Sequence, residues 1–397
     1  MTQPASQNGR SSILVVDDNE LNRDILSRRL QKHGHRVDVA EHGVRALEMM
    51  AESPYDLVML DIMMPLMNGY EVLERLKSDP ALCHVPVIMI TAVDDEESIV
   101  RCIALGAEDH MPKPFNPALL KARVSSSLAK KRLHDREQIY AASLERELDI
   151  GRQIQEGFLP EHLPVAAGWE LTACFQPARQ VAGDFYDAFE LPDDKIAIVV
   201  ADVCDKGVGA ALFMAIFRSL FRALAEQRFT AASPADAPSA ALLDVITATN
   251  DYIGRTHARA NMFATVFFGV LDPVSGRLWY VNGGHEAPLV LTATGVERTR
   301  LAPTGPAVGM MPDMTFGTAE VDLGHGESLL AYTDGVLDAR SPAGEHFGEE
   351  RLRTCACTSP RDVLRTIQDA LTEFSAGEPA YDDVTMLCVR REGATVG

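Results

Sequence analysis

The sequence predicts two folded units of different class: an N-terminal α/β unit with a doubly wound, parallel, five-stranded sheet, and a C-terminal α+β two-sheet sandwich flanked by helices. Three observations predict this. Short apolar runs alternate with helical-period stretches in the first part of the chain, a charged segment with few helix breakers follows, and strand-like patterns dominate beyond Trp169. A chain of 397 residues is also long enough to bury two cores.

The apolar runs of the first unit have the length of buried strands, and most are followed by a stretch with helical period. This alternation is typical of βαβ units, whose helices cover both faces of a parallel sheet. Strands are expected at Ile13–Val16, Leu57–Leu60, Val87–Ile90 and His110–Pro112, and helices at Leu21–Leu30, Val44–Met50 and Ser98–Leu105.

A single long helix is predicted between Leu120 and Phe158, where apolar residues recur mostly every four to seven positions and Leu159-Pro160 supplies the stop. Two interpretations of this helix stay open. It is either a solvated linker or a coiled coil that pairs two chains, in which case the protein is a homodimer.

The second unit shows strands of alternating or wholly apolar character with helical segments between them, which favours a two-sheet sandwich. The expected strands are Glu170–Phe175, Lys195–Ala201, Ala264–Leu271, Arg277–Asn282, Ser328–Tyr332 and Val384–Arg390, and the expected helices are Ala210–Glu226, Ala240–Thr256 and Pro360–Phe374.

The charge and composition exclude several classes of partner. The formal net charge is −20, and residues 166–397 alone carry 18 basic and 31 acidic side chains, so we expect no nucleic acid partner. No apolar run approaches the roughly 20 residues of a membrane span, and the N-terminus is polar. The seven cysteines lack Cys-x-x-Cys spacing. These features predict a cytoplasmic protein with reduced thiols and no membrane association.

Polar residues follow the strands of the first unit one after another. Asp17 and Asp18 follow the first strand, Asp61 the third, Thr91 the fourth and Lys113 the fifth. Ligands of an open parallel sheet collect beyond the carboxyl ends of its strands. Three carboxylates at one edge need a cation, for which Mg²⁺ is well suited, while the hydroxyl and the ammonium can contact phosphoryl oxygens. Asp61 is then the predicted nucleophile.

Residues 10–127 resemble the receiver domains of two-component response regulators, which have the flavodoxin-like fold. The resemblance rests on the strings Val-Val-Asp-Asp, Met-Leu-Asp-Ile-Met-Met-Pro, Ile-Thr-Ala and Pro-Lys-Pro-Phe. It implies that a histidine kinase or phosphotransfer protein donates a phosphoryl group. The implied roles are Asp61 as phosphoacceptor, Asp17, Asp18, Asp61 and the backbone carbonyl of Met63 as Mg²⁺ ligands, Thr91 as switch hydroxyl, Lys113 as phosphate contact, and His110 as a switch residue where the family often has Tyr or Phe.

Four acidic motifs of the second unit place an aspartate at a strand edge beside small residues. Clusters of carboxylate oxygens suit hard divalent cations. Two such ions would lower the pKa of a bridging water that attacks phosphorus in line, so no protein nucleophile is needed. The motifs are Gly183-Asp184, Ala201-Asp202-Val203, Thr333-Asp334-Gly335 and Asp382-Asp383-Val384-Thr385.

Residues 150–392 resemble the PPM family of metal-dependent serine/threonine phosphatases (protein phosphatase type 2C), in the branch of sporulation and stress sigma-factor regulators. The domain itself is expected at 166–393, after a linker at 128–165. The resemblance implies two Mn²⁺ or Mg²⁺ ions: Asp184 bridges both, Asp202 with the Val203 carbonyl holds one, Asp334 and Asp382 hold the other, and Asp383 is a reserve ligand. It rests on the strings Val181 to Asp187, Asp202 to Gly207, Asn282-Gly283-Gly284-His285, Thr333-Asp334-Gly335 and Asp382-Asp383, and on an entry helix from Glu147 to Pro160.

Two positions leave alternatives open. Many relatives have Ser-Gly-His or Ser-Gly-Lys after the Asp-Val pair, whereas this chain has Cys204-Asp205-Lys206. His285 is either a ligand or general acid, or a loop residue satisfied by the backbone.

Together the two resemblances predict a response regulator whose phosphorylation controls hydrolysis of phosphoserine or phosphothreonine on a protein partner. The implied substrate is an anti-sigma-factor antagonist. One rival is a pseudophosphatase that captures a partner, without hydrolysis, when Asp61 is phosphorylated. Another is a nucleotidyl cyclase, although the chain lacks a Gly-Gly-Asp/Glu-Glu-Phe type string.

Overall fold

The computed structural model describes residues 10–91, 96–229, 237–358 and 362–393. The chain divides into two compact units, Met1–Leu144 and Glu145–Gly397. Each unit is described by itself below.

The first unit is built on a five-stranded parallel sheet in the order β2-β1-β3-β4-β5. This confirms the predicted doubly wound α/β class. The elements are β1 Ser12–Val16, α1 Glu20–Lys32, β2 Arg36–Ala40, α2 Gly43–Glu52, β3 Leu57–Asp61, α3 Gly69–Ser78, β4 Val87–Thr91, α4 Glu96–Ala104, β5 Asp109–Pro112 and α5 Pro117–Glu156.

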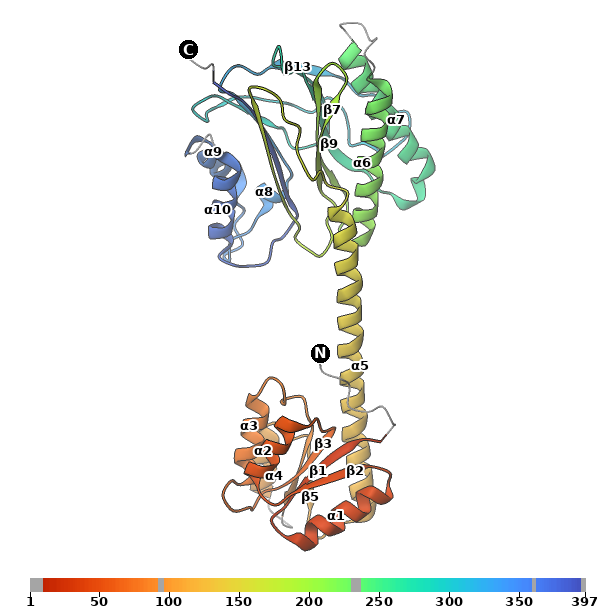
Figure 1. Cartoon of the computed structure of the whole chain (residues 1–397), viewed down its shortest axis with the longest axis vertical. Coiled ribbons are helices and arrows are strands. Elements are labelled where there is room, and N and C mark those ends of the chain that lie inside the picture. Colours follow the sequence, from red (N-terminus) through yellow and green to blue (C-terminus); the bar gives the residue numbers. More distant parts are fainter. Residues whose placement is uncertain (1–9, 92–95, 230–236, 359–361, 394–397) are drawn as a thin grey trace. The chain divides into compact units, whose positions relative to one another are not determined.

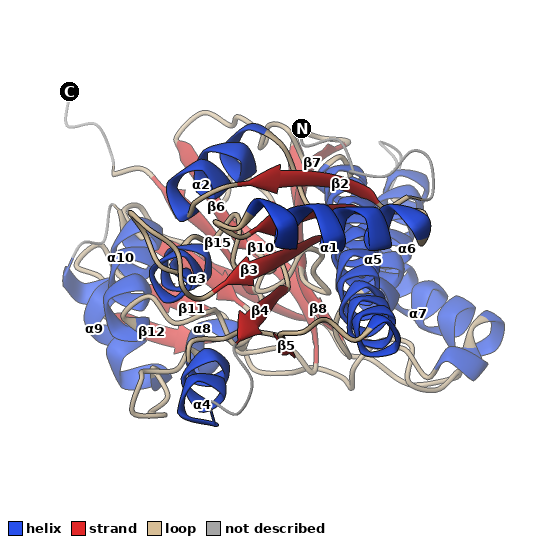
Figure 2. Ribbon diagram, turned by 90° about the horizontal axis from the view of Figure 1, so that it is seen from below, coloured by secondary structure: helices blue, strands red, loops and turns tan. Residues whose placement is uncertain are grey.

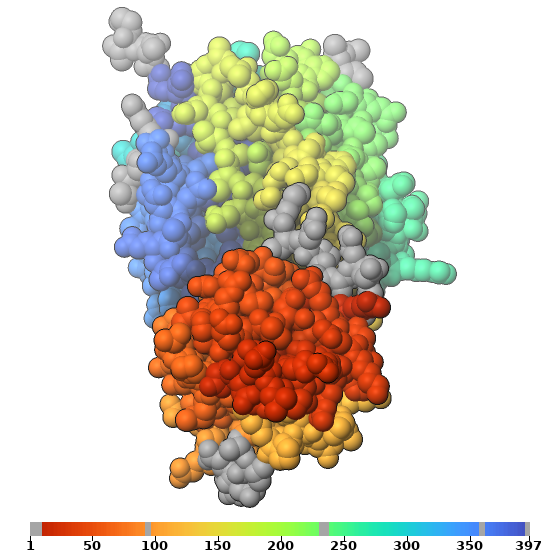
Figure 3. Space-filling view, turned by 60° about the horizontal axis from the view of Figure 1, so that its bottom comes forward, coloured from red at the N-terminus to blue at the C-terminus, as the bar shows by residue number. Residues whose placement is uncertain are grey.

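Helices cover both faces of this sheet (Figure 1). Side chains of α1 and the start of α5 pack on one face, where Leu26 and Leu120 meet Ile13, Ile88 and other strand residues. Helices α2, α3 and α4 pack on the other face. The space-filling view shows the resulting closed body, coloured red to orange (Figure 3).

Helix α5 is a single helix of 40 residues, close to the predicted span of Leu120 to Phe158. Its first turns are anchored because Leu120, Val124 and Leu128 lie in the core of the first unit. Further along, several large apolar side chains are exposed: Leu133, Ile139, Tyr140, Leu144, Ile150 and Ile154. Pairing of two chains through this helix stays a prediction.

The second unit contains two five-stranded sheets, in the orders β13-β10-β9-β8-β7 and β12-β11-β14-β15-β6. Its strands are β6 Trp169–Gln176, β7 Phe185–Leu191, β8 Lys195–Val203, β9 Ala264–Leu271, β10 Arg277–Gly283, β11 Leu289–Leu291, β12 Glu297–Arg300, β13 Ala319–Asp322, β14 Ser328–Tyr332 and β15 Val384–Arg391. Its helices, beyond the end of α5, are α6 Val208–Arg228, α7 Ala237–Thr256, the 3-10 helix η1 Ala258–Ala260, α8 Gly335–Asp338, α9 Gly348–Thr358 and α10 Val363–Ser375.

The two sheets pack face to face, with helices on the outer side of each (Figures 1 and 2). One core lies between the sheets, where Val200 and Phe267 meet Leu329 and Leu387. A second core joins α6 and α7 to the first sheet, and a third joins α9 and α10 to the second. The predicted helix-flanked sandwich is confirmed.

Helix α6 is long and apolar enough, by length and composition, to cross a membrane, with a mean hydropathy of 1.6. It corresponds to the helix expected at Ala210–Glu226, where the sequence predicted no membrane span. Its residues Met214, Phe217 and Phe221 pack fully buried against the sheet that contains β7 and β8. The three residues form an apolar stripe at positions i, i+3 and i+7, as in a helix that packs one face on a sheet, while 28% of the most apolar window is buried.

Candidate active sites

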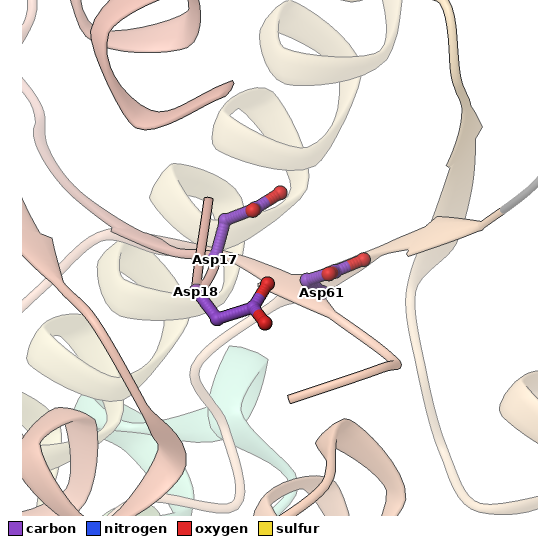
Figure 4. A group of neighbouring side chains, drawn as sticks. All are labelled: Asp17, Asp18 and Asp61. Carbon is purple, nitrogen blue, oxygen red and sulfur yellow. The ribbon is translucent and has the colours of Figure 1, made fainter. Parts of the chain in front are cut away.

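The first site lies at the carboxyl ends of β1 and β3. Asp17 and Asp18 follow β1, Asp61 ends β3, and one oxygen of each lies within 4.8 Å of the others (Figure 4). Asp17 and Asp61 are buried, whereas Asp18 is exposed. The structure therefore brings together the three carboxylates that the strand order predicts.

Lys113 supplies a positive charge inside this cluster. Its Nζ lies 3.1 Å from Asp17 Oδ2 and 2.9 Å from Asp61 Oδ1. Burial raises the pKa of Asp61 to about 6, and the charge of Asp17 adds to this, while the hydrogen bond from Lys113 opposes it. The residual rise shows that one ammonium does not fully compensate the carboxylates, which fits a site for a divalent cation.

Two residues that the sequence analysis missed hold Asp17 and Asp18 in place. Asn22 Nδ2 donates to both carboxylate oxygens of Asp17 at 3.1 Å. Arg23 Nη1 donates to the backbone carbonyls of Asp17 and Asp18 at 2.7 and 2.9 Å. Both lie on the first turn of α1, and their polar side chains there were the available clue.

The predicted switch residues lie on β4 and β5. The Thr91 hydroxyl, at the end of β4, is buried and has no hydrogen-bond partner among the described residues. His110 lies half-buried on β5, with Nδ1 3.7 Å from Asp109 Oδ1. Met63 projects an exposed side chain just after β3. Their roles stay predictions.

The second site combines aspartates from both sheets of the sandwich. Asp184 precedes β7 and Asp202 lies near the end of β8, in one sheet, while Asp334 follows β14 and Asp382 precedes β15, in the other. Close backbone packing allows this approach. A Cβ on Gly183 would lie 2.8 Å from the Val203 carbonyl oxygen, and one on Gly335 would lie 1.9 Å from that of Asp383.

Burial and neighbouring negative charges raise the pKa values of three aspartates at the second site. Burial and the charge of Asp202 raise the pKa of Asp184 well above its usual range. Burial and Asp334 raise the pKa of Asp202 to about 7, and burial and Asp382 raise that of Asp334 to about 6. Gathered carboxylates with raised pKa values are the donor set expected for divalent cations.

Asp383 has a different role from its neighbour. Its two carboxylate oxygens accept hydrogen bonds from the backbone N–H groups of Ala178 at 2.8 Å and Gly183 at 2.9 Å. It thus ties the second sheet to the segment that carries Asp184. This arrangement favours a clamping role for Asp383 over the reserve ligand role.

Lys206, in the turn that departs from the family pattern, contacts the second site directly. Its Nζ lies 2.7 Å from Asp382 Oδ2 and donates to the Tyr381 carbonyl at 3.0 Å. The ammonium also lies 4.8 Å from the centre of the Tyr381 ring, and the Arg340 guanidinium lies 3.7 Å from that centre. Two cations therefore flank the residue next to a predicted ligand.

His285 is buried in the loop after β10. Its backbone N–H donates to Asn282 Oδ1 at 2.8 Å, and Nδ1 lies 2.9 Å from the Thr265 hydroxyl. Burial lowers its pKa to about 3, so the ring is neutral at physiological pH and unsuited to act as a general acid there. The other ring nitrogen, Nε2, is buried without a hydrogen-bond partner among the described residues, so the choice between the two alternatives stays open.

Comparison with known proteins identifies both units. Residues 13–125 match the family model of the response regulator receiver domain, and residues 192–392 match that of stage II sporulation protein E (SpoIIE). Protein IcfG of Synechocystis sp. is 44% identical over 263 residues, covering 62% of this chain and 41% of that protein. Response regulator PleD of Caulobacter vibrioides is 41% identical over 114 residues, covering 29% of this chain and 25% of that protein.

A solved structure agrees on the fold of the second unit. The SiaA-PP2C domain of Pseudomonas aeruginosa aligns with a TM-score of 0.51 and 23% identity, covering 63% of this chain and 98% of that domain. Fold and sites together define a response regulator with a phosphatase-type output domain. The chain belongs to the SpoIIE family, whose domain is of the PPM type, and carries an N-terminal receiver.

The predicted family resemblances and enzyme class, a metal-dependent protein serine/threonine phosphatase, are confirmed at this level. A receiver joined to a PPM-type domain indicates a regulated phosphatase. The chain spans less than half the length of the curated relatives described above.

Proposed function

We propose that this chain hydrolyses phosphoserine or phosphothreonine on a protein partner in the cytoplasm, and that phosphorylation of Asp61 controls the rate. The observation that carries the proposal is the convergence of Asp184, Asp202, Asp334 and Asp382 from two sheets, each sheet contributing two carboxylates. The raised pKa values of Asp184, Asp202 and Asp334 indicate a demand for positive charge. Within the described part of the chain, the close ammonium at this site is Lys206, which contacts Asp382.

The chain's own residues would do three things. Asp184, Asp202 with the Val203 carbonyl, Asp334 and Asp382 would hold two Mn²⁺ or Mg²⁺ ions, and Thr333 orients Asp184 through a 2.7 Å hydrogen bond. Lys206 and Arg340 would attract a phosphate to the rim. When bound, the ions would supply Lewis acidity and activate water.

In the receiver, Asp17, Asp18 and the Met63 carbonyl would hold Mg²⁺ beside Asp61. Lys113 and Thr91 would contact the phosphoryl oxygens. His110 would change its orientation when Thr91 moves toward the phosphoryl group. A histidine kinase or phosphotransfer protein would donate the phosphoryl group. By family resemblance the substrate of the output domain is an anti-sigma-factor antagonist, and the exposed apolar residues of α5 would support a homodimer.

One experiment tests the assignment. A phosphoserine-bearing anti-sigma-factor antagonist is incubated with Mn²⁺ and the wild type, Asp202→Ala, or Asp244→Ala, which removes an exposed carboxylate on α7. Each reaction is run with and without beryllofluoride. We expect Asp202→Ala to lose about 100-fold or more in rate, as for removal of a ligand that organises the site, and Asp244→Ala to match the wild type.

The outcomes separate the parts of the proposal. An Asp202→Ala variant as active as the wild type would overturn the metal assignment. Equal rates with and without beryllofluoride would overturn control by the receiver. A wild type that binds the phosphoprotein but never hydrolyses it would favour the capture module instead.

A further inference from the structure

The segment that carries Asp184 is held by three different elements, one at each of three successive residues. Gln155, in the last turn of α5, binds Ala182. Asp383, just before β15, accepts from the Gly183 N–H. Thr333, at the end of β14, donates to Asp184 Oδ2. Two of these supports belong to the second sheet, whereas the third belongs to the helix that enters the unit.

Gln155 makes the contact with both ends of its amide. Nε2 donates to the Ala182 carbonyl at 2.7 Å, and Oε1 accepts from the Ala182 N–H at 2.9 Å. Gln155 is 6% exposed and Ala182 is fully buried. Water therefore cannot replace these bonds, and losing them would leave both backbone groups of Ala182 unpaired, which is costly in a buried position.

The rest of the last turns of α5 packs on the same side. A Cβ on Gly151 would lie 3.6 Å from Val181 Cγ1, so the helix backbone passes in van der Waals contact with that residue. Phe158, just beyond the helix, packs against the core formed by α6 and the first sheet. Gly151 and Gln155, four positions apart, share one helical face, whereas Ile154 is 61% exposed.

We propose that Gln155 is a positioning residue that makes the end of α5 part of the support of Asp184. This rests on the proposed function, because it assumes that Asp184 is a metal ligand. A displacement of the last turn would withdraw the amide, loosen Ala182, and move the ligand next to it. Helix α5 thus begins in the core of the receiver, and its last turn binds the backbone beside Asp184.

The test uses the full-length chain and two substitutions at the same position. Gln155→Leu removes both hydrogen bonds. Gln155→Asn keeps the amide but withdraws it by one methylene, about 1.5 Å, and so disturbs packing less. Gln153→Leu and Gln153→Asn are matched controls, since Gln153 lies on the same turn and is exposed.

The main readout is Mn²⁺ affinity by isothermal titration calorimetry, with amide hydrogen exchange of the peptide that contains Ala182 as a second. We expect both Gln155 variants to lose about tenfold in Mn²⁺ affinity, a typical effect of outer-shell changes, and to exchange the Ala182 amide faster. The Gln153 variants should match the wild type. With p-nitrophenyl phosphate at saturating Mn²⁺, kcat should fall more than KM rises.

Gln155→Asn that folds, binds Mn²⁺ as tightly as the wild type and protects Ala182 equally would overturn the proposal. If Gln155→Leu fails to fold, the Asn variant decides. A wild type that binds Mn²⁺ but hydrolyses no phosphate ester would refute the proposed activity, and the affinity comparison would still test Gln155. A wild type that binds no Mn²⁺ would overturn both.

Discussion

The two acidic sites of this chain obtain their compensating positive charge from different sources. In the receiver, Lys113 lies within 3.1 Å of both buried carboxylates, so a resident ammonium bridges Asp17 and Asp61. In the output domain the only close ammonium that the described residues provide is Lys206, and it contacts Asp382 at the rim. Asp184 and Asp202, deeper in the site, have no such partner among the residues that the structure describes. Burial raises the pKa of both, with the charge of Asp202 adding to the rise at Asp184 and that of Asp334 to the rise at Asp202.

The receiver site therefore has a positive charge between its buried carboxylates before a cation binds. In the output site, the buried carboxylates repel one another until cations bind. Substitutions of Lys113, Asp202 and Lys206, in that order of expected effect, test this contrast.

Replacing Lys113 by Met should destabilise the receiver by about 1 to 3 kcal/mol. Removing one partner of a buried pair leaves uncompensated carboxylates, and the partial exposure of Lys113 reduces the full cost. The urea unfolding transition of the receiver measures this effect. Lys130→Met, which breaks an exposed ion pair with Glu108, should change stability far less. If both substitutions lowered the stability equally, Lys113 would not be the group that compensates the charges of Asp17 and Asp61.

Replacing Asp202 by Asn should have the opposite effect on stability. We expect it to stabilise the metal-free output domain by about 1 to 2 kcal/mol near pH 8. The folded pKa of Asp202 is about 7, above the unfolded value, so the ionised wild type is destabilised as pH rises from about 4 to about 7. Below pH 4 both states are protonated and the variants should converge. Thermal unfolding with EDTA at several pH values measures this.

The same variant should lose its response to Mn²⁺. A wild-type domain gains about 2.7 kcal/mol when Mn²⁺ is present at 100 times its Kd, whereas Asp202→Asn should gain little because a ligand is missing. If the substitution destabilised the metal-free domain at pH 8, the stored repulsion inferred here would be wrong.

Replacing Lys206 by Gln should raise Mn²⁺ affinity about twofold to fivefold. The ammonium lies 2.7 Å from Asp382 and competes with a cation there, but both side chains are partly exposed, which limits the effect. Calorimetry measures the affinity. Lys195→Gln, at the start of β8, the strand that precedes the turn with Lys206, serves as the control because Lys195 pairs with Asp193. Weaker Mn²⁺ binding by Lys206→Gln would instead mean that the lysine helps to orient Asp382.

Much of the receiver could be predicted from the sequence because its strands are short, apolar and followed by polar residues. Asp17, Asp61 and Thr91 lie where the strand order places them. Strand β2, Arg36–Ala40, was not predicted, since it is an edge strand with only Ala40 buried and lacks an apolar run. Helix α5 was predicted well because its charged composition contains almost no breakers.

The output domain was harder to predict at its edges and at its long-range contacts. Strands β12 and β13 are short, polar and at sheet edges, so they carry little periodicity. Strand β7 was not predicted, because its first residues were read as part of the acidic motif that contains Asp184. The contacts of Gln155 with Ala182 and of Lys206 with Asp382 join residues 27 and 176 positions apart, and no local pattern encodes such pairs.

The tight packing at Gly335 has a practical consequence. The glycine beside Asp334 faces the Asp383 carbonyl so closely that a methyl group would lie 1.9 Å from its oxygen. A larger residue there must push apart the two strand ends that bring Asp334 and Asp382 together. The formal charge and all the carboxylates would be kept. Such a variant would be a route to a substrate trap. It would keep the surface that recognises the substrate but lose hydrolysis, because the metal ligands are moved apart.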